Sequence, residues 1–235
     1  MPLTVGSKNE ETRVKWIESA LKKIPGGLTI LDAGAGECQF RKFCGHLNYI
    51  SQDFGKYDGS KEVGLQIKDW DNTKLDIVSD ITEIPLPDGS LDAIMCTEVF
   101  EHIPDPIKAI QEFKRLLKPN GYLIITAPFA SLTHFAPYHF ASGLSRYFYE
   151  HHLNNNEFNI EEIDFNGNFF EFVAQETGRI PIIAAKYSSA KLNFIERRLL
   201  RLNLWILQKL SMGDKGSSEL LCFGIHVFAR KNKTS

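Results

Sequence analysis

Three carboxylates and a pair of glycines are the residues of this chain whose types and spacing are suited to binding a ligand. Asp32, Gly34 and Gly36 stand together in the segment LDAGAGECQF, while Asp53 and Asp80 end two later apolar segments, NYISQD and LDIVSD. Glycines let a ligand approach the backbone where a Cβ would clash. Carboxylates repel phosphate groups and attract cations. The pattern therefore favours a positively charged ligand over a pyrophosphate.

The spacing between the glycines and the second carboxylate indicates what this ligand contains. Asp53 lies 19 residues after Gly34, which is typical of a carboxylate that accepts hydrogen bonds from the ribose hydroxyls of an adenosine. Asp80 then lies one strand further out, placed to accept from the adenine amino group, with Ile81 against the ring. A nicotinamide dinucleotide is the alternative, but its fingerprint requires a third glycine where this chain has Gln39.

Alternating strands and helices must position these residues. Short apolar runs typical of buried parallel strands are LTILDAG, NYISQD, LDIVSD, LDAIMCTE and YLIITAP. Helical spacing of apolar residues is found over residues 9–24 and in DPIKAIQEFKRLL, a further helix is predicted in CQFRKFCGHL, and KPNG is a predicted turn. This alternation predicts an α/β fold with a parallel sheet. Ligands bind such sheets outside the carboxyl ends of the strands, where the acidic residues would gather.

The pattern changes after Pro128. An aromatic, histidine-containing loop, FASLTHFAPYHFASG, precedes a predicted helix over about 144–153. FNIEEIDF alternates as a half-exposed strand does, and ELLCFGIHVFARK predicts a last strand. About fifty residues lie between these two strands, roughly 168–218. That length is too great for a bare connection and predicts a helical insert.

Composition narrows the class of protein. The 235 residues, 43% of them hydrophobic, are enough for a single domain over residues 1–235. A net charge of −2, from 27 basic and 29 acidic residues, predicts no nucleic-acid partner. Four cysteines without CxxC spacing are typical of reduced thiols, and the polar N-terminus and lack of a long apolar run predict no signal peptide or membrane span. We expect a cytoplasmic protein, monomeric or homodimeric.

Several segments resemble those of class I S-adenosylmethionine-dependent methyltransferases that act on small molecules. They are LDAGAGE, the Asp53 strand end, VSDITEIPLPDGSLDAIMCTEVFEHIPDP and FKRLLKPNGYLIITAP. The resemblance covers about residues 28–128 and is absent from the insert. It implies a Rossmann-like, seven-stranded, mostly parallel sheet with its last strand antiparallel, helices on both faces, and S-adenosylmethionine as cofactor. A cofactor with a positive charge agrees with the acidic strand ends.

The resemblance also implies a set of cofactor-binding residues. Asp32, Gly34 and Gly36 would surround the methionine half, and the residues at 96–98 would line the methyl side. The full set is Asp32, Gly34, Ala35, Gly36, Asp53, Phe54, Asp80, Ile81, Cys96, Thr97 and Glu98. Two features depart from the family pattern: Cys38 replaces its third glycine, and the helix after the second strand is poor because of Gly55, Gly59 and Gly64.

Histidines supply the candidate chemistry. Glu101 and His102 follow the fourth strand, and a histidine there can act as a general base because its ordinary pKa is near 6.5. The alternative is that both side chains only hold the loop. In this fold the loop after the fifth strand generally borders the acceptor pocket, although its aromatic residues can also be simple packing. We predict His102 and His139 as catalytic bases and His134 and Tyr138 as substrate-binding residues; no metal-ligand spacing is evident.

The predicted function is methyl transfer to a small-molecule acceptor. A sugar hydroxyl of a glycan precursor is expected, because HFAPYHFASGLSRYFYEHHL loosely resembles methyltransferases among bacterial surface-polysaccharide enzymes. A lipid or quinone-like acceptor is the alternative, given the apolar insert. A module that binds S-adenosylmethionine without turnover is the alternative from another functional class, and a nicotinamide oxidoreductase is the third.

The insert has more apolar residues than one packing face needs. In LNFIERRLLRLNLWILQKL they occupy more than one side of the predicted helix. We predict that the insert forms a lid over the acceptor pocket, which Phe169, Phe170 and Phe172 help to close. The alternatives are a contact with a second subunit and a peripheral membrane contact that uses Arg197, Arg198 and Arg201.

Overall fold

The computed structural model describes residues 2–57, 64–65 and 74–233 of the chain. Most of the poor helical segment predicted after the second strand, including Gly59, lies outside these residues. The strands are β1 (Thr29–Ala33), β2 (Asn48–Asp53), β3 (Ile77–Val78), β4 (Leu91–Thr97), β5 (Leu117–Pro128), β6 (Phe158–Asn166) and β7 (Gly224–Lys231). The α-helices are α1 (Asn9–Lys22), α2 (Pro106–Leu116), α3 (Arg146–Asn155), α4 (Phe169–Tyr187) and α5 (Phe194–Met212), and the short 3-10 helices are η1 (Arg41–Phe43), η2 (Phe100–His102) and η3 (Ser217–Glu219).

The chain folds into two compact units. The sheet unit consists of Lys15–Asp164 and the chain from Gly224 onward, and the helical unit consists of the chain up to Val14 together with Phe165–Phe223. The predicted N-terminal helix over 9–24 is α1, which ends at Lys22. The predicted insert over 168–218 holds α4 and α5, so its helical character agrees with the structure.

A seven-stranded sheet organises the fold, with the strand order β3-β2-β1-β4-β5-β7-β6. The neighbours from β3 to β5 pair in parallel, and β7 pairs antiparallel with β5. This confirms the predicted mostly parallel sheet with an antiparallel last strand. The central strands β1 and β4 are buried on both faces, which explains their continuous apolar sequences.

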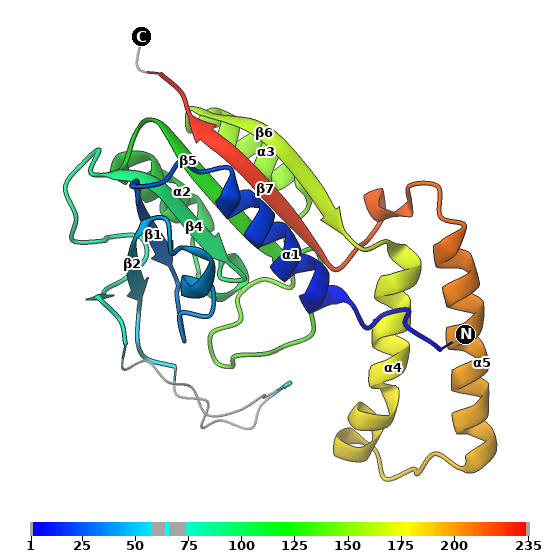
Figure 1. The fold of residues 1–235 in the computed structure, drawn as a ribbon. Helices are drawn as coiled ribbons and strands as arrows, with labels where there is room; N and C mark the ends of the chain where they lie inside the picture. The colour runs from blue at the N-terminus through cyan, green and yellow to red at the C-terminus, as the bar shows by residue number, and fades with distance from the viewer. Residues whose placement is uncertain (1, 58–63, 66–73, 234–235) are drawn as a thin grey trace. The chain divides into compact units, whose positions relative to one another are not determined.

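Helices cover both faces of this sheet, as predicted. The C-terminal turns of α1 cross the front of the sheet in Figure 1, and α2 and α3 lie behind it. On the front face the Trp16 ring lies 4.8 Å from the His226 ring of β7, and its Nε1 donates to the Asp164 carboxylate of β6 at 2.7 Å. These contacts attach α1 to the antiparallel edge of the sheet.

Helix α2 shows how local sequence places an element on the sheet. The Asp105 carboxylate caps the helix by accepting a hydrogen bond from the Lys108 N–H, and Pro106 occupies the first helical turn. One face is apolar and buried, and full burial of its phenylalanine contributes about 1.5–3 kcal/mol. The buried apolar residues of this face are Ala109, Ile110, Phe113 and Leu116.

Two local predictions differ from the structure. The helix predicted in CQFRKFCGHL is wrong, because the structure has only η1 there. Cys38 adopts φ = 56°, a left-handed conformation that an α-helix cannot contain. The predicted KPNG turn lies inside β5, where the pairing with β4 shifts register and Asn120 has φ = 63°. The turn is therefore absorbed as an irregularity in the strand.

The helical unit has a small core of its own. Val5, Ala174 and Leu207 are buried together, and Phe170 packs against them. The backbone N–H of Gly6 donates to the Glu171 carboxylate at 2.6 Å, which attaches the N-terminal segment to α4. Because Phe170 contributes to this core, it stabilises the helical unit directly.

Much of the apolar surface of α4 and α5 is exposed. The two helices lie side by side in Figure 1, and α5 begins with a capping box in which Asn193 and Glu196 satisfy each other's backbone N–H groups. Within the described residues, no helix combines the length and apolar character that a membrane span requires. The exposed large apolar residues of the two helices are Ile180, Ile182, Tyr187, Phe194, Ile195, Leu199, Leu202, Trp205, Ile206, Leu210 and Met212.

Candidate active site

The glycine loop after β1 is bound to the neighbouring strand by its backbone. The N–H groups of Gly34 and Ala35 both donate to the carbonyl oxygen of Gln52 on β2, each at 2.8 Å. Gly34 has φ = 78°, and a Cβ at this position would lie 2.4 Å from Cγ2 of Val99. Only glycine fits here, because any side chain would meet both the strained backbone and this close contact. The packing against Val99 and the hydrogen bonds to Gln52 thus fix the conformation of the loop at the carboxyl end of β1.

Asp32 is a carboxyl group buried beside this loop. It is 1% exposed, its Oδ2 accepts a hydrogen bond from the Tyr49 hydroxyl at 2.5 Å, and its Oδ1 has no hydrogen-bond partner among the described residues. Burial raises the pKa of Asp32 to about 7, helped by the charge of Asp53 and opposed by the hydrogen bond from Tyr49. An ionised carboxylate in this position requires a cation beside it.

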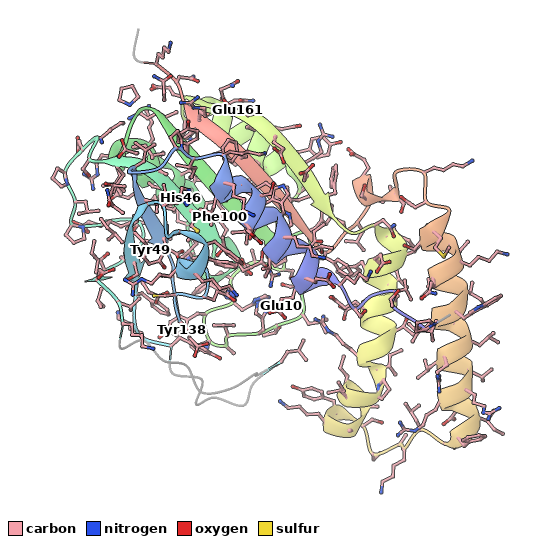
Figure 2. All side chains as sticks on the ribbon, in the orientation of Figure 1. Glu10, His46, Tyr49, Phe100, Tyr138 and Glu161 are labelled. Atoms are coloured by element: carbon pink, nitrogen blue, oxygen red, sulfur yellow. The ribbon has the colours of Figure 1, made fainter. Side chains whose placement is uncertain are left out.

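Tyr49 was not predicted as a site residue. It extends from β2 (Figure 2), and it reaches Asp32 because the two strands pair with Asp32 opposite Ser51. The sequence marks Tyr49 only as a strand residue, since the register that aligns the two side chains is a property of the folded sheet.

Asp53 lies against the glycine loop, as the resemblance requires of the residue that reaches the ribose. It is 8% exposed, its Oδ2 accepts from the Gly36 N–H at 3.1 Å, and its Oδ1 accepts from the Gly55 N–H at 2.9 Å. Burial raises the pKa of Asp53, while the hydrogen bonds from the backbone lower it. The carboxylate is held between two backbone segments. Its contact with the ribose stays a prediction.

Asp80 and Ile81 follow β3 at the same edge of the sheet. The Oδ1 of Asp80 accepts from the backbone N–H and the hydroxyl of Thr82, both at 2.8 Å, and these bonds lower the pKa of Asp80. Ile81 is buried, whereas Asp80 is exposed. The side-chain amide of Gln52 donates to the Ser79 carbonyl at 2.7 Å and so attaches this segment to β2. The adenine contact of the pair stays a prediction.

The end of β4 brings the three predicted methyl-side residues to this edge. Cys96 is fully buried, and burial raises the pKa of its thiol. Thr97 ends the strand, and Glu98 turns the chain sharply with φ = 56°. Glu98 is held by Thr126 of β5: its N–H donates to the Thr126 carbonyl at 2.7 Å, and its Oε1 accepts from the hydroxyl at 2.9 Å.

The loop after β5 is attached to η2 and to the segment after β2. The N–H groups of Phe140 and Ala141 donate to the Glu101 carbonyl, at 2.9 and 3.2 Å. The Tyr138 ring meets the Phe54 ring edge-on, with centroids 4.9 Å apart. The structure thereby brings a predicted acceptor-binding residue against a predicted cofactor-binding residue.

Three histidines gather between η2 and this loop. The ring centroid of His134 lies 4.6 Å from that of His102 and 5.0 Å from that of His139. Because a carbonyl oxygen can only accept, the His102 Nδ1–H donates to the Tyr138 carbonyl at 2.6 Å. Burial, together with the charge of His134, lowers the pKa of His102 to about 3. The predicted base therefore stands neutral near physiological pH, with its Nε2 carrying the lone pair.

Comparisons with known proteins agree with this arrangement. Residues 31–125 match a family model described as a methyltransferase domain. The match spans the glycine loop, the acidic strand ends and the histidine-bearing end of β4. Residues 31–125 are thus similar to a methyltransferase domain, and the sheet that contains them has the class I methyltransferase fold.

Curated relatives match parts of this chain. The ubiquinone biosynthesis O-methyltransferase of Xanthomonas oryzae pv. oryzae (strain PXO99A) is 50% identical over 38 residues, 16% of this chain and 16% of its own length. The 2-methyl-6-phytyl-1,4-hydroquinone methyltransferase of Synechocystis sp. is 30% identical over 112 residues, 45% of this chain and 33% of its own length. The chain therefore spans about a third or less of these two relatives.

Solved structures share the fold across almost the whole chain. An S-adenosylmethionine-dependent methyltransferase from Archaeoglobus fulgidus has a TM-score of 0.55 at 19% identity, covering 94% of this chain and 97% of that one. The cyclase SpnF has a TM-score of 0.58 at 15% identity, covering 96% and 84%. At such identities the likeness concerns the fold alone, and the cyclase shows that this fold serves more than one reaction.

Two buried residues, one in residues 31–125 and one on α3, are not among the catalytic or binding residues predicted from the sequence. Both carboxylate oxygens of Glu101 are buried without a hydrogen-bond partner in the described part of the chain, as is the hydroxyl of Tyr149 on α3. Burial raises the pKa of both groups, and the charge of Glu101 raises that of Tyr149 further. The sequence indicates Tyr149 only as a residue of a predicted helix, because no local pattern shows that its hydroxyl is buried.

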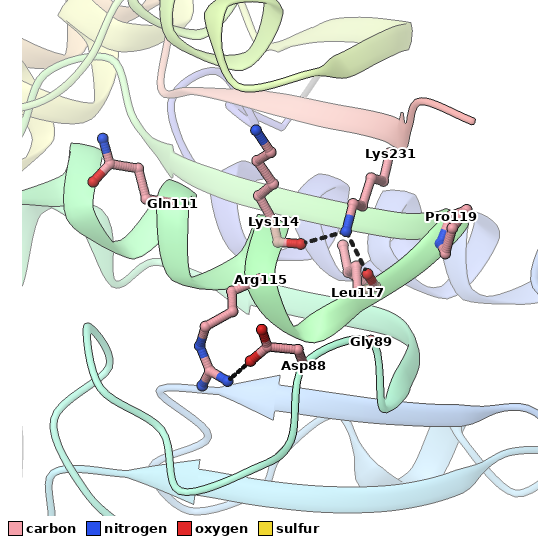
Figure 3. Close-up of a pocket in the computed structure, with 8 residues that line it drawn as sticks. All are labelled: Asp88, Gly89, Gln111, Lys114, Arg115, Leu117, Pro119 and Lys231. Carbon is pink, nitrogen blue, oxygen red and sulfur yellow. Dashed lines mark hydrogen bonds and ion pairs between the residues drawn. The ribbon is translucent and has the colours of Figure 1, made fainter. Parts of the chain in front are cut away.

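A shallow pocket lies at the opposite edge of the sheet, and we interpret its charged residues as stabilising the fold. It lies by the start of β5 and the end of α2, where Arg115 pairs with Asp88 at 2.6 Å and Lys231 donates to the carbonyls of Lys114 and Leu117 (Figure 3). These charged groups satisfy one another and the exposed helix end. The candidate site residues named above lie at the carboxyl edge of the sheet instead.

Proposed function

We propose that this protein transfers a methyl group from S-adenosylmethionine to a hydroxyl group of a small-molecule acceptor. The observation that carries the proposal is the buried Asp32, whose Oδ1 has no hydrogen-bond partner among the described residues and whose raised pKa favours a cation beside the glycine loop. A dinucleotide would bring phosphates to this loop, and an ionised Asp32 would repel them. The matching family model supports the same conclusion.

Each residue of the site is proposed to contact a different part of S-adenosylmethionine. Asp32 holds the positively charged methionine half, Asp53 accepts from the ribose hydroxyls, and Ile81 packs against the adenine. Phe54 and Tyr138, in contact with each other, separate the cofactor side from the acceptor side. S-adenosylmethionine supplies an electrophilic methyl carbon on a sulfonium, so the protein's main contribution is to align the acceptor and exclude water.

The acceptor is proposed to carry an apolar part. Two observations support a lipid or quinone-like acceptor: α5 exposes large apolar side chains such as Leu202 and Trp205, at 53% and 56%, and the two curated relatives are named for ubiquinone and hydroquinone chemistry. Exposed apolar area of this extent marks a surface with a partner or ligand. A sugar hydroxyl of a glycan precursor is the second candidate, supported by the polar His134 and Tyr138 side chains that face the same loop.

The helical unit is proposed to serve the acceptor. As a lid it would shield the reacting hydroxyl from water, with Phe169 and Phe172 contributing to closure. The basic residues Arg197, Arg198 and Arg201 beside the exposed apolar positions support the alternative role, in which α5 rests on an anionic membrane that carries the acceptor. Both roles give the protein access to an apolar substrate.

The experiment is a transfer assay with methyl-labelled S-adenosylmethionine and three acceptors. They are a hydroquinone with an isoprenoid chain, the same hydroquinone without the chain, and a lipid-linked sugar. Label on the chain-bearing hydroquinone supports the proposed acceptor, and label on the sugar alone moves the assignment to the glycan precursor. Binding of S-adenosylhomocysteine without transfer to any acceptor would support a module without turnover.

A matched pair of variants links the transfer to the site. Asp32→Asn keeps the size of the side chain and removes its charge, so labelled product is expected to disappear. Asp88→Asn removes a carboxylate at the opposite edge of the sheet, where it pairs with Arg115, and is expected to leave the product yield unchanged. Equal yields from the two variants would place the cofactor elsewhere.

A further inference from the structure

The three histidines beside the predicted acceptor side form a group with the geometry of metal ligands. One ring nitrogen from each of His102, His134 and His139 lies within 4.8 Å of the other two. A tetrahedral zinc site with Zn–N bonds of 2.0–2.1 Å holds its nitrogens about 3.3 Å apart. The nitrogens therefore need to converge by up to about 1.5 Å to bind one ion.

The tautomers of this cluster leave nitrogen lone pairs pointing away from the backbone. The Nδ1–H of His102 donates to the Tyr138 carbonyl at 2.6 Å, and the Nδ1–H of His134 donates to the Leu132 carbonyl at 2.9 Å. In both rings the Nε2 is then the unprotonated nitrogen. Metal-binding histidines have this arrangement, in which one nitrogen binds a backbone carbonyl and the other binds the ion.

Buried polar atoms without hydrogen-bond partners beside the three histidines are a second indication of a bound cation. The Nδ1 of His139 is buried without a hydrogen-bond partner among the residues described, as are both carboxylate oxygens of the fully buried Glu101. The Oε1 of Glu101 lies 3.6 Å from the Nε2 of His102 and 3.8 Å from the Nε2 of His134. A buried carboxylate beside imidazoles is costly unless a positive charge stands among them. Burial lowers the pKa of His134, but its interaction with Glu101 outweighs this and raises it, so this charge comes from a protonated His134 or from a metal ion.

We propose that His102, His134 and His139 bind one divalent transition-metal ion of the zinc type, with Glu101 as the carboxylate that balances its charge. Imidazole nitrogens select zinc and related ions over magnesium and calcium, which prefer oxygen ligands. The histidines lie 32 and five residues apart along the chain. The sequence therefore shows no metal-ligand spacing, and only the folded loop assembles the site.

The site has a consequence for catalysis that rests on the proposed function. Three protein nitrogens leave a fourth position of a tetrahedral ion open, as in catalytic zinc sites. An acceptor hydroxyl bound there would lose its proton to water more readily, because the ion lowers the pKa of the bound oxygen. In that arrangement His102 and His139 hold the ion and do not act as bases.

The test uses the full chain without a polyhistidine tag, freed of metal with EDTA and dialysed. Calorimetric titration with Zn²⁺ is expected to give one equivalent bound per chain. The double variant His134→Ala/His139→Ala is expected to lose at least about 100-fold in affinity, more than the removal of an outer hydrogen-bond partner costs. His151→Ala is the matched control, because this exposed histidine lies on α3 outside the cluster, and its affinity should equal that of the wild type.

Two results would overturn the proposal. One is the absence of stoichiometric Zn²⁺ binding to the wild type, and the other is unchanged affinity in the double variant. If the double variant does not fold, the visible spectrum of the Co²⁺-loaded wild type decides: an intense tetrahedral band supports the site, and a weak spectrum like that of aqueous Co²⁺ contradicts it. S-adenosylhomocysteine binding to the metal-free wild type tests the cofactor site separately, so failure of the metal proposal is distinguishable from failure of the proposed function.

Discussion

The affinity for the cofactor is expected to fall about tenfold for each pH unit below neutrality, because binding requires the ionised form of a single carboxyl group, that of Asp32. In the protein without cofactor, burial raises the pKa of Asp32 from 3.8 to about 7. A shift of about three units corresponds to about 4 kcal/mol, which is the cost of ionising this group without a cation beside it. A cofactor that brings a positive charge to Asp32 favours its ionised form, so binding below pH 7 must release a proton.

The sign of the linked stability effect follows from the raised pKa. Between about pH 4 and about pH 7 the folded protein holds a proton on Asp32 that the unfolded chain has lost. The stabilisation is fully present below the unfolded pKa and is lost as the pH rises through about 7. The groups that share this environment are Tyr49, Asp53, Cys44 and Cys96, and Asp53 acts in the same direction. Asp32→Asn, which carries no ionisable proton, should lose this part of the pH dependence.

The assay is calorimetric titration of S-adenosylmethionine, which carries the sulfonium charge, between about pH 5.5 and about pH 8.5, in two buffers with different ionisation enthalpies. We expect release of close to one proton at about pH 6 and of almost none at about pH 8.5. Asp88→Asn should behave as the wild type does. Equal affinity across this range, with no proton release, would refute the assignment of Asp32 to a cationic ligand.

Three further predictions concern single features of the site and the helical unit. Asp53→Ala should weaken S-adenosylhomocysteine binding by about 2–4 kcal/mol, because charge-assisted hydrogen bonds to the ribose are lost, and should also lower the melting temperature, because the N–H groups of Gly36 and Gly55 lose their acceptor; unchanged affinity in the titration would contradict the ribose contact. Gly34→Ala should lower the unfolding free energy by at least about 1–2 kcal/mol, since its φ of 78° disfavours a side chain and Val99 stands in the way; denaturation that matches the wild type would count against the close contact. Leu202→Glu with Trp205→Glu should spare cofactor binding and lower transfer to a chain-bearing acceptor but not to its chainless analogue, and an equal loss for both acceptors would count against an apolar surface that serves the acceptor.

The strands that carry the acidic residues could be predicted because their local sequence pattern is enough to identify them as strands. The segment NYISQD is β2 from its first residue to its last, since a short apolar run between polar residues has few alternatives in a parallel sheet. The antiparallel β7 was likewise expected from the family resemblance. The predicted helix after the glycine loop failed because the left-handed backbone of Cys38 outweighed the apolar spacing that followed it.

The side-chain contacts of the site could not be predicted in the same way. The hydrogen bond from Tyr49 to Asp32 depends on the register of two strands. The approach of His134 to His102 depends on backbone hydrogen bonds between the loop after β5 and Glu101. Such contacts arise from three-dimensional pairing, for which the local pattern of residue types carries no signal.

The most direct test of the central claim is a calorimetric titration of the wild-type protein at about pH 8 with S-adenosylhomocysteine and, separately, with NADH. The acidic strand ends and the glycine loop predict one site of micromolar affinity for S-adenosylhomocysteine and no heat of binding for NADH. Binding of NADH in place of S-adenosylhomocysteine, or of neither ligand, would contradict the account.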